Sequence, residues 1–379
     1  MQGHTIRILR IIARMNIGGP ALQISTLMRE LPQEEFQQLL IYGQCGSNEI
    51  DYLESNEISV PNIRLRNLGR SISVLQDFLA FLAIWRLIRS FQPDILHTHT
   101  FKAGLLGRLA TLPLRNRPVV MHTFHGHLLH GYFGVLKTRL VIYTERFLAN
   151  LTDVLITVGE RVKYDLLAQR IGSPAKYRVV RPGFDFILNQ TFNRIHLGIG
   201  QDEFVCCWVG RLTDIKKPNR ILEIAKELES HGVKNVTFLI VGDGELRKNV
   251  EKEAVSNSFP VKFVGWQSNS IDYIAISDIL ISTSENEGTP IALIEAQQLG
   301  KPIIATNVGS VSEVMIPNES GYLLDYDAHE FSKRILLLKE SQNIYEKFSS
   351  KAKEFAKTQF SAVTFVSNYK KLYKQSLNL

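Results

Sequence analysis

Short apolar runs that alternate with segments of helical periodicity constrain the fold of this 379-residue sequence more than any other feature. In the first half, apolar runs at Ile6–Ala13, Asp94–His97 and Val119–Phe124 are separated by segments whose apolar residues recur every three or four positions. The second half repeats the alternation, with runs at Phe204–Val209 and Val236–Val241. Such alternation predicts an α/β protein with parallel sheets, whose ligands bind beyond the carboxyl ends of the strands.

The compartment is indicated by cysteine use and by the first segment. The three cysteines are Cys45, Cys206 and Cys207, and an odd, sparse count favours a reducing compartment. The apolar run from Ile6 to Ala13 contains charged residues and leads into a Gly-rich loop, so it predicts a first strand and not a signal peptide. No uncharged stretch is long enough to cross a bilayer. We therefore expect a cytoplasmic protein.

Charge is distributed unevenly along the chain. Residues 1–190 contain 22 Lys and Arg against 14 Asp and Glu, whereas residues 191–379 contain 22 against 23. A basic first half favours an anionic partner, either a membrane surface or nucleic acid, although scattered solvated side chains are an equal alternative. The basic residues of the first half fall in two groups: Arg64, Arg66 and Arg70, then Lys102, Arg108, Arg115 and Arg117. They lack an aromatic stacking set, so we expect no nucleic-acid partner.

The stretch Ser282–Ala296 is the strongest candidate for a ligand site. It follows an apolar strand-like run and contains a loop, then a helix predicted to begin near Pro290, where a missing N–H is tolerated. Gly288 permits close approach of a ligand, and the free amides at the helix start favour an anion. Glu287 and Glu295 flank this turn and suit a ligand with hydroxyl groups on both sides of a diphosphate. An ordinary strand–loop–helix unit is the alternative.

Other strand-to-loop junctions carry related signals. Gly18 and Gly19 follow the first strand and precede a helix, but they lack the glycine spacing of a dinucleotide site. Arg211 and Lys216 follow the strand Phe204–Val209 and are well placed for two phosphates, unless they are simply basic residues of a surface loop.

Six histidines crowd one region of the first half. They are His97, His99, His122, His125, His127 and His130. A zinc site is disfavoured because no cysteine and no His-Glu-x-x-His helix lies nearby. His125 is the better candidate, because it follows a buried strand and precedes Gly126, at a carboxyl end where ligands bind. His97 and His99 end the preceding strand, where an acceptor-binding role and a structural role are equally compatible with the sequence.

Taken in order, these pieces resemble the retaining glycosyltransferases of family 4, of the bacterial envelope polysaccharide type. The resemblance spans nearly the whole chain and rests on Gly18-Gly19, His125-Gly126, Gly210-Arg211 with Lys216, Gly242-Asp243-Gly244, and Glu287 and Glu295, which are separated by seven residues. It implies the GT-B fold: two Rossmann-like parallel-sheet domains facing across a cleft. The implied domains are an acceptor domain at 1–185, a nucleotide-sugar domain at 186–358, and a C-terminal helix at 359–379 that packs back on the first.

The resemblance also implies roles for the site residues. Arg211 and Lys216 would hold the donor diphosphate, although Lys217 stands where the family often has glycine, so the sequence leaves open which lysine points inward. Glu295 would bind the ribose, Glu287 the hydroxyls of the sugar, and His125 the sugar or its anomeric centre. The remaining implied nucleotide-binding positions are Gly18, Gly19, Gly242, Gly265, Gly288, Thr289 and Pro290.

The implied activity is transfer of a sugar from a nucleoside diphosphate sugar, most simply a UDP-sugar, to a saccharide or lipid-linked acceptor in polysaccharide biosynthesis. We expect no cofactor and no metal, because Arg211, Lys216 and the amides at the helix start would stabilise the departing diphosphate in place of a metal ion. The enzyme is expected in the cytoplasm, including the inner face of the membrane. The alternatives are another GT-B enzyme, such as a nucleotide-sugar 2-epimerase, and a non-catalytic assembly subunit. A phosphorylase is disfavoured because no lysine context for pyridoxal is present.

Overall fold

The computed structural model describes residues 5–46, 49–55, 60–69, 73–126, 134–186, 188–189 and 191–379. Arg70, His127 and His130, which the sequence singled out, lie outside these residues, as does Ile58 of a strand expected near 58–60. The described chain forms two compact units. Unit 1 comprises Met1–Phe184 and Ser361–Leu379, and unit 2 comprises Asp185–Phe360. The sequence placed the corresponding divisions after residues 185 and 358.

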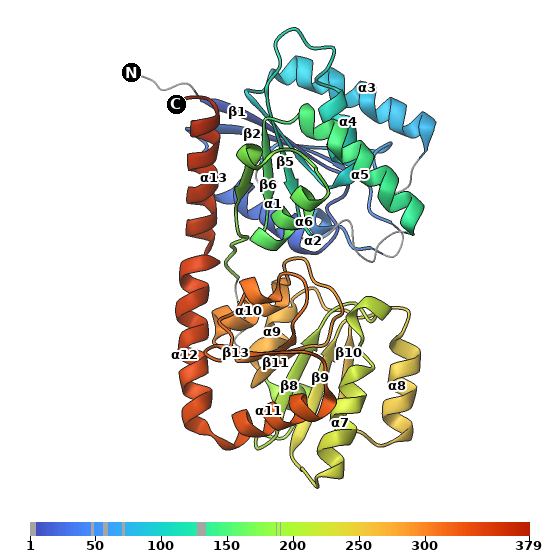
Figure 1. Cartoon of the computed structure of the whole chain (residues 1–379), viewed down its shortest axis with the longest axis vertical. Helices are drawn as coiled ribbons and strands as arrows, with labels where there is room; N and C mark the ends of the chain where they lie inside the picture. The colour runs from blue at the N-terminus through green and yellow to red at the C-terminus, as the bar shows by residue number, and fades with distance from the viewer. Residues whose placement is uncertain are drawn as a thin grey trace. The chain divides into compact units, whose positions relative to one another are not determined.

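Unit 1 contains a parallel sheet of seven strands in the order β3-β2-β1-β4-β5-β6-β7 (Figure 1). Its strands are β1 Ile6–Ile12, β2 Phe36–Gly43, β3 Asn62–Leu65, β4 Ile95–His99, β5 Val119–Phe124, β6 Val154–Thr157 and β7 Tyr177–Val179. Its helices are α1 Gly19–Glu30, α2 Tyr52–Ser55, α3 Val74–Phe91, α4 Phe101–Leu109, α5 Val135–Asn150, α6 Glu160–Ala168, η1 Pro174–Lys176 and α13 Ala362–Ser376.

Unit 2 contains a six-stranded parallel sheet in the order β10-β9-β8-β11-β12-β13. Its strands are β8 Phe204–Val209, β9 Val236–Val241, β10 Val261–Gly265, β11 Ile279–Ser282, β12 Ile303–Thr306 and β13 Gly321–Leu324. Its helices are η2 Arg194–Leu197, η3 Asp214–Lys216, α7 Arg220–Ser230, α8 Arg247–Ser256, α9 Ser270–Ala275, α10 Ile291–Leu299, η4 Val311–Glu313, α11 Ala328–Glu340 and α12 Gln342–Gln359.

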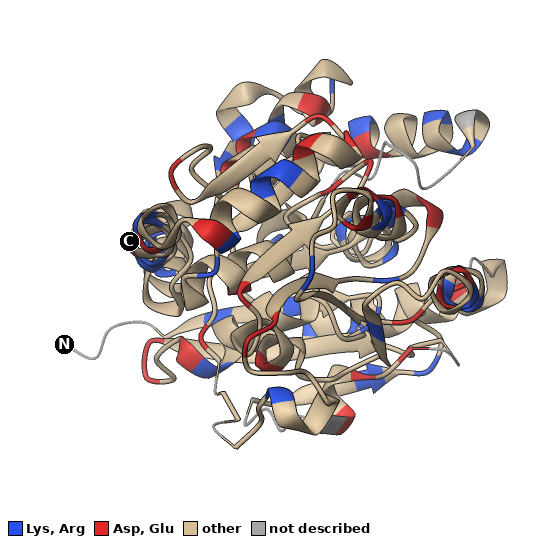
Figure 2. Cartoon of the chain, turned by 90° about the horizontal axis from the view of Figure 1, so that it is seen from below, with Lys and Arg blue, Asp and Glu red and all other residues tan. Residues whose placement is uncertain are grey.

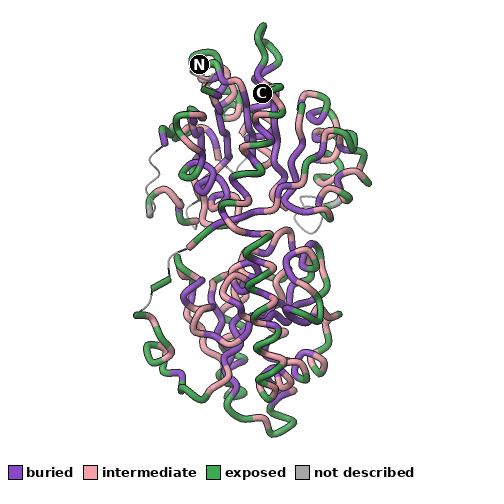
Figure 3. The backbone as a smooth tube through the Cα atoms, turned by 90° about the vertical axis from the view of Figure 1, so that its left-hand side faces the viewer, coloured by how far each residue is buried: buried purple, intermediate pink, exposed green. Residues whose placement is uncertain are grey.

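Both sheets have doubly wound topology, because in each the strand order reverses beside the first strand of the unit. The inner strands, such as β4, β9, β11 and β12, are buried along their whole length, as strands covered on both faces of a parallel sheet require (Figure 3). This confirms the predicted α/β architecture of two Rossmann-like domains. It also locates the two places where ligands of such sheets bind: beside β1 and β4 in unit 1, and beside β8 and β11 in unit 2.

Helix α13 is the C-terminal element, yet it completes the core of unit 1. Ser361 caps its first turn by accepting a hydrogen bond from the Thr364 amide. Buried residues at helical spacing, including Phe365, Tyr369 and Tyr373, pack in one cluster with strand residues such as Ile8. Burial of this stripe explains why the last helix belongs to the first unit.

Ion pairs neutralise much of the basic surface expected in the first half. Arg64 pairs with Asp51 and Glu54, and Lys102 with Asp77. Arg108 is fully buried against Glu145 at 2.8 Å, and Arg117 pairs with Asp153. Basic and acidic residues are accordingly intermixed along the described chain (Figure 2). Four of the seven basic residues singled out from the sequence are therefore paired with carboxylates.

Candidate active site

The strongest cluster of charged and hydroxyl groups in unit 2 joins the loops that follow β8 and β11. These two strands are neighbours, with Ile279 paired to Cys206 and Leu280 to Cys207. The loop after β8 carries Arg211 and Lys216, and the loop after β11 carries Glu287 and leads to α10. Parallel pairing thus places both loops at the same edge of the sheet, where the strand order reverses.

Lys216 and Glu287 join these two loops directly. Lys216 Nζ lies 2.5 Å from Glu287 Oε1, and the Ser284 hydroxyl donates to the same oxygen at 2.6 Å. The neighbouring Lys217 has a left-handed backbone, φ 48°, and pairs with Asp214 and Glu285. The structure therefore answers the question that the sequence left open: Lys216, and not Lys217, contacts the buried Glu287 carboxylate.

Thr283 fastens the two loops together behind this pair. Its hydroxyl lies 3.0 Å from the Lys217 carbonyl and 3.2 Å from the Lys216 carbonyl, and it accepts a hydrogen bond from Trp208 Nε1 at 3.0 Å. The Glu285 amide donates to the carbonyl of Ile215 at 2.9 Å. Because these hydrogen bonds join the two loops directly, they hold the backbone at Lys216 in a fixed position relative to the loop that carries Glu287.

Helix α10 presents its N-terminus beside Glu287. The helix starts at Ile291, with Pro290 as the N-cap residue and no side-chain cap. The amides of Gly288, Thr289, Ile291 and Ala292 donate no hydrogen bond within the described residues. The Thr289 hydroxyl is buried and likewise has no partner in the described part of the chain. Free amides and an unpaired hydroxyl at a helix N-terminus suit an anionic ligand.

Glu295 lies one turn further along α10 and differs from Glu287 in its surroundings. Its carboxyl group is 3.5 Å from the Ser270 hydroxyl, and burial raises the pKa of Glu295 to about 8. No cation pairs with it among the described residues. A carboxyl group held neutral in this way is a hydrogen-bonding group that can ionise when a ligand supplies donors.

Arg211 lies in the loop after β8 and is exposed to solvent. Its guanidinium forms no hydrogen bond or ion pair with any residue in the described ranges. In contrast to Lys216, Arg211 can therefore pair with a ligand without breaking an ion pair to a described residue.

Gly242 and Gly265 bring the next two loops against the first. Gly242 has φ +141°, and a Cβ there would lie 1.9 Å from the carbonyl oxygen of Gly210. Its amide donates to the Gly265 carbonyl at 2.8 Å, and Gly265 has φ +73°. Only glycine fits Gly242, because a side chain would overlap the backbone that leads to Arg211.

In unit 1 the predicted residues also follow strand ends. Gly18 is the N-cap of α1 and Gly19 its first residue, with Pro20 in the first turn. His125 follows β5 directly, and its Nε2 lies 2.9 Å from Nδ1 of His99 at the end of β4. Burial lowers the pKa of His125 to about 3, so both rings are neutral at physiological pH.

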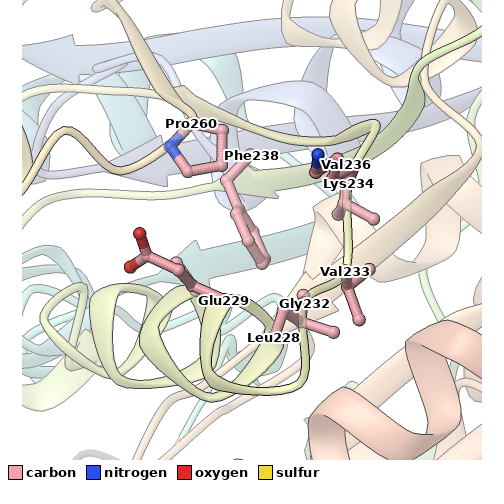
Figure 4. A pocket seen from close by; sticks show the side chains of 9 residues that line it. Leu228, Glu229, Gly232, Val233, Lys234, Val236, Phe238 and Pro260 are labelled. Carbon is pink, nitrogen blue, oxygen red and sulfur yellow. The ribbon is translucent and has the colours of Figure 1, made fainter.

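The structure separates these positions from two other features of unit 2. A cavity of about 270 Å³ is lined by Phe238, Pro260 and residues at the end of α7 (Figure 4). It lies where β9 and β10 begin, at the opposite edge of the sheet from Lys216. Among the described residues, the one group of three possible metal ligands is Glu227, His231 and His329, on the outer ends of α7 and α11.

Sequence reasoning missed several side chains that the structure joins to the predicted ones. Ser284 and Thr283 were given no role, because nothing in the spacing of a loop hydroxyl indicates what it will contact. Ser270 is distant from Glu295 in sequence. His99, by contrast, was named from the sequence. It ends β4, and β4 pairs with β5, which leads into His125, so the two histidines lie at the same edge of the sheet.

Comparisons with known proteins give the following matches. The sequence profile described as Glycosyltransferase Family 4 matches residues 17–186, and that described as Glycosyl transferases group 1 matches residues 189–355. The chain is 28% identical over 354 residues, 90% of each chain, to UDP-Gal:alpha-D-GlcNAc-diphosphoundecaprenol alpha-1,3-galactosyltransferase of Escherichia coli. It is 22% identical over 323 residues to the capsular polysaccharide biosynthesis glycosyltransferase CapM of Staphylococcus aureus, covering 82% of this chain and 84% of CapM.

Solved structures match over almost the full length. Anabaena HepE in complex with UDP and glucose has a TM-score of 0.81 at 20% identity, covering 98% of this chain and 100% of HepE. Sucrose-phosphate synthase from Thermosynechococcus elongatus has a TM-score of 0.81 at 18% identity, covering 98% and 99%. These matches, together with the two doubly wound sheets, confirm the predicted GT-B fold.

Proposed function

Since this chain belongs to glycosyltransferase family 4, a family of retaining enzymes, we propose that it transfers a sugar from a UDP-sugar to a lipid-linked saccharide, with retention of configuration and without a metal ion. The proposal starts from the glycosyltransferase activity in polysaccharide biosynthesis that the relatives' names indicate. The observation that carries it is the Lys216–Glu287 contact at 2.5 Å beside the free amides of α10. It combines a cation, a carboxylate and an anion-binding helix end in one site.

The donor diphosphate would be bound by unit 2. Arg211 supplies a guanidinium without a described partner, Lys216 an ammonium, and the start of α10 its free amides. Negative charge grows on the leaving diphosphate in the transition state, and fixed donors stabilise that charge without reorganising. These groups would do the work that a divalent metal does elsewhere, which is the basis for proposing that no metal is needed. UDP is the nucleotide in the HepE complex, and UDP-Gal the donor named for the Escherichia coli relative.

The two glutamates would have different tasks. Glu287 pairs with Lys216, and its carboxyl oxygens can accept hydrogen bonds from hydroxyls of the donor sugar. Glu295, whose pKa is raised to about 8, would receive the ribose hydroxyls and ionise as it does so. His125, neutral because of burial, would contact the sugar without adding positive charge near the anomeric centre. Front-side attack by the acceptor hydroxyl would then retain configuration.

An amphiphilic face on unit 1 supports a lipid-linked acceptor. Helix α5 exposes Leu136, Leu140, Tyr143 and Phe147, spaced by three or four residues so that they share one side of the helix. Exposed apolar residues of α3 add to this set; they are Val74, Leu75, Phe78 and Leu79. Exposed apolar residues that share one side of a helix favour an interaction site, and the exposed cations Lys137, Arg139, Arg86 and Arg89 on α5 and α3 favour an anionic lipid surface.

The acceptor named for the Escherichia coli relative is a sugar on a diphosphoundecaprenol, a membrane lipid. We propose an acceptor of the same chemical class here, a saccharide linked through diphosphate to a polyprenol. Contact with the membrane would be peripheral, on its cytoplasmic side, through α3 and α5. No described helix is both long and apolar enough to cross a bilayer.

The donor assignment is tested by thermal shift with UDP, GDP and ADP, each with EDTA and with magnesium. A ligand that binds the folded state alone raises the melting temperature by mass action. We expect a response to UDP that EDTA leaves unchanged and that Arg211→Ala abolishes. No response to any nucleotide would contradict the transferase proposal and favour a non-catalytic role. A response that requires magnesium would contradict metal independence alone.

The acceptor assignment is tested by sedimentation with vesicles of phosphatidylglycerol or of phosphatidylcholine. Binding to the anionic vesicles is expected, with loss in Leu140→Asp. Val255→Asp is the matched control, since Val255 is equally exposed but lies on α8 of unit 2. Equal loss in both variants, or no binding by the wild type, would contradict the membrane contact. Release of UDP together with a free, altered sugar in the absence of acceptor would identify an epimerase instead.

A further inference from the structure

The proposed function leaves unexplained a pair of buried histidines in unit 1. His99 ends β4, His125 follows β5, and His99 Nδ1 lies 2.9 Å from His125 Nε2. The two rings are 5.2 Å apart between centroids. Each neutral imidazole has one N–H donor and one acceptor nitrogen, so this bond determines which nitrogen of each ring carries the proton.

The sheet explains why the two rings meet. His97 and His99 alternate along β4 and therefore lie on one face, and Thr123 and His125 share that same face one strand away. His99 is opposite Thr123 in the parallel register, so His125 is the next residue on this face toward the carboxyl edge. His97 also stacks against His99, with ring centroids 4.1 Å apart.

His97 is itself fixed from both sides. Its Nδ1 lies 2.8 Å from the Tyr373 hydroxyl, and its Nε2 lies 2.8 Å from the Thr123 hydroxyl. Arg10 donates to Tyr373, so helix α13 and strand β1 both hold this ring. His99 therefore packs against the His97 ring, which cannot rotate without breaking buried hydrogen bonds. Losing a buried hydrogen bond is costly in free energy.

Two nitrogens of the pair remain open. His99 Nε2 and His125 Nδ1 are buried, and neither has a partner among the described residues. The proton shared between the rings determines what the open atoms offer. If His99 donates, His125 carries its proton on Nδ1 and is a donor there; if His125 donates, its Nδ1 is an acceptor.

We propose that His99 is a positioning residue for His125, holding its ring in one orientation and one tautomer so that Nδ1 presents a single hydrogen-bonding role to the ligand. This proposal rests on the proposed function, in which His125 contacts the donor sugar. Burial lowers the pKa of both rings far enough that the pair stays uncharged at neutral pH. The unpartnered, buried Nδ1 of His125 is the atom that such an arrangement would leave for a ligand.

Three variants separate positioning from bulk packing. In His99→Asn the side-chain amide reaches the place of Nδ1, whereas in His99→Gln the same amide reaches the place of Nε2, so only the first can keep the bond to His125. His122→Asn is the control, because His122 is another buried histidine with an open Nε2, on the opposite face of β5 and bonded to Thr98 instead.

The first readout is the ¹⁵N spectrum of the His125 ring in the ligand-free protein, which distinguishes the two neutral tautomers. The wild type and His99→Asn are expected to show one tautomer, and His99→Gln an average of both. The second readout is UDP release from UDP-galactose and UDP-N-acetylglucosamine. We expect kcat to fall about 10- to 100-fold in His99→Gln, with rescue in His99→Asn and little change in KM for the donor.

The outcomes separate this inference from the proposed function. A His125 spectrum that His99→Gln leaves unchanged would overturn the positioning role, whatever the activity. Equal loss of activity in His99→Asn, His99→Gln and His122→Asn would also overturn it, by showing that packing alone matters. A wild type that neither binds UDP nor releases it would instead overturn the proposed function, and a tautomer change in that protein would still establish that His99 fixes His125.

Discussion

The carboxyl edges of the two sheets use opposite chemistry although their topology is the same. In unit 2 the edge is charged. Lys216 pairs with Glu287, Arg211 has no partner among the described residues, and α10 presents free amides. In unit 1 the edge is neutral: four histidines are buried, and their bonds run to hydroxyls and to one another. A common fold therefore supplies only the place, and the side chains decide whether that place suits a diphosphate or an uncharged polar group.

Acidification is expected to have the largest effect, and it should act on unit 1. Burial depresses the pKa of His97, His99, His122 and His125, so below about pH 6.5 the unfolded chain binds protons that the folded unit does not. Stability is full above that pH and falls as pH drops, by up to about 1.4 kcal/mol per pH unit for each histidine. Pulsed hydrogen exchange in urea at pH 7 and pH 5 should show unit 1 opening first in acid.

Unit 2 should respond with the opposite sign over the same range. The raised pKa of Glu295 means that the folded unit keeps a proton that the unfolded chain loses, so this contribution is full below about pH 4.5 and is lost as pH rises through about 8. Glu295→Gln should flatten the response of unit 2 and leave that of unit 1 unchanged. If the stabilities of the two units changed with pH in the same direction, the proposed difference between their two edges would be contradicted.

Removing a cation from the charged edge should have the next largest effect. Lys216→Ala is expected to lower kcat/KM for the UDP-sugar about 1000-fold and Arg211→Ala about 100-fold, because both stabilise charge on the leaving group. Only Lys216→Ala should also lower the melting temperature, since it leaves the buried Glu287 carboxylate without its cation. Enzyme assay and calorimetry measure the two effects.

Lys217→Asn is the matched control for this pair of variants. Lys217 lies in the same loop with φ 48°, a conformation that asparagine tolerates, and its partners Asp214 and Glu285 are solvent-exposed. Activity within about twofold of the wild type is expected, because exposed ion pairs contribute little. A loss as large as that of Lys216→Ala would show that the loop, and not the individual cation, is what matters.

A methyl group at Gly242 should destabilise unit 2 by about 3 kcal/mol, from positive φ and from overlap with the Gly210 carbonyl. Gly232→Ala should cost only about 1 kcal/mol, because Gly232 has φ +69° but open space around it. The difference between the variants, measured by urea unfolding followed on unit 2, isolates the close backbone approach. Equal effects would mean that the loop relaxes and that the approach is not essential.

The smallest expected effect concerns UDP affinity and pH. If ribose hydroxyls bind the ionised form of Glu295, affinity should rise about tenfold per pH unit up to about pH 8, and binding at pH 7 should release a proton. Calorimetry in buffers of different ionisation enthalpy measures that proton. Glu295→Gln should abolish both the release and the slope, and a flat profile in the wild type would exclude Glu295 as an ionised ligand.

Much of the fold was predictable from the sequence because its signals are local. The apolar run Phe204–Val209 identifies a buried strand, and the helical spacing of Leu75, Phe78 and Leu82 identifies a helix, without reference to the rest of the chain. The helix expected near Pro290 begins one residue later, with Pro290 as its cap. The short strand predicted near 58–60 falls mostly on residues that the structure does not describe, and the described edge strand beside β2 is Asn62–Leu65.

The site was predictable only in part. Motif order identified Arg211, Lys216, Glu287, Glu295 and His125, and their roles remain predictions. The sequence did not indicate that Ser284 shares a carboxylate oxygen with Lys216, or that His99 bonds to His125. Those contacts connect strands that are distant in sequence, and the register that aligns them is a property of the assembled sheet.

The sequence by itself determined two α/β halves and the loops that carry the candidate chemistry, because periodicity, glycines and helix starts act over a few residues. Only the tertiary structure decided which lysine contacts Glu287, that burial raises the pKa of Glu295 to about 8, and that the histidines of unit 1 form a hydrogen-bonded network with depressed pKa values. Protonation and pairing depend on burial and on which strands become neighbours, and both exist only once the sheet has formed.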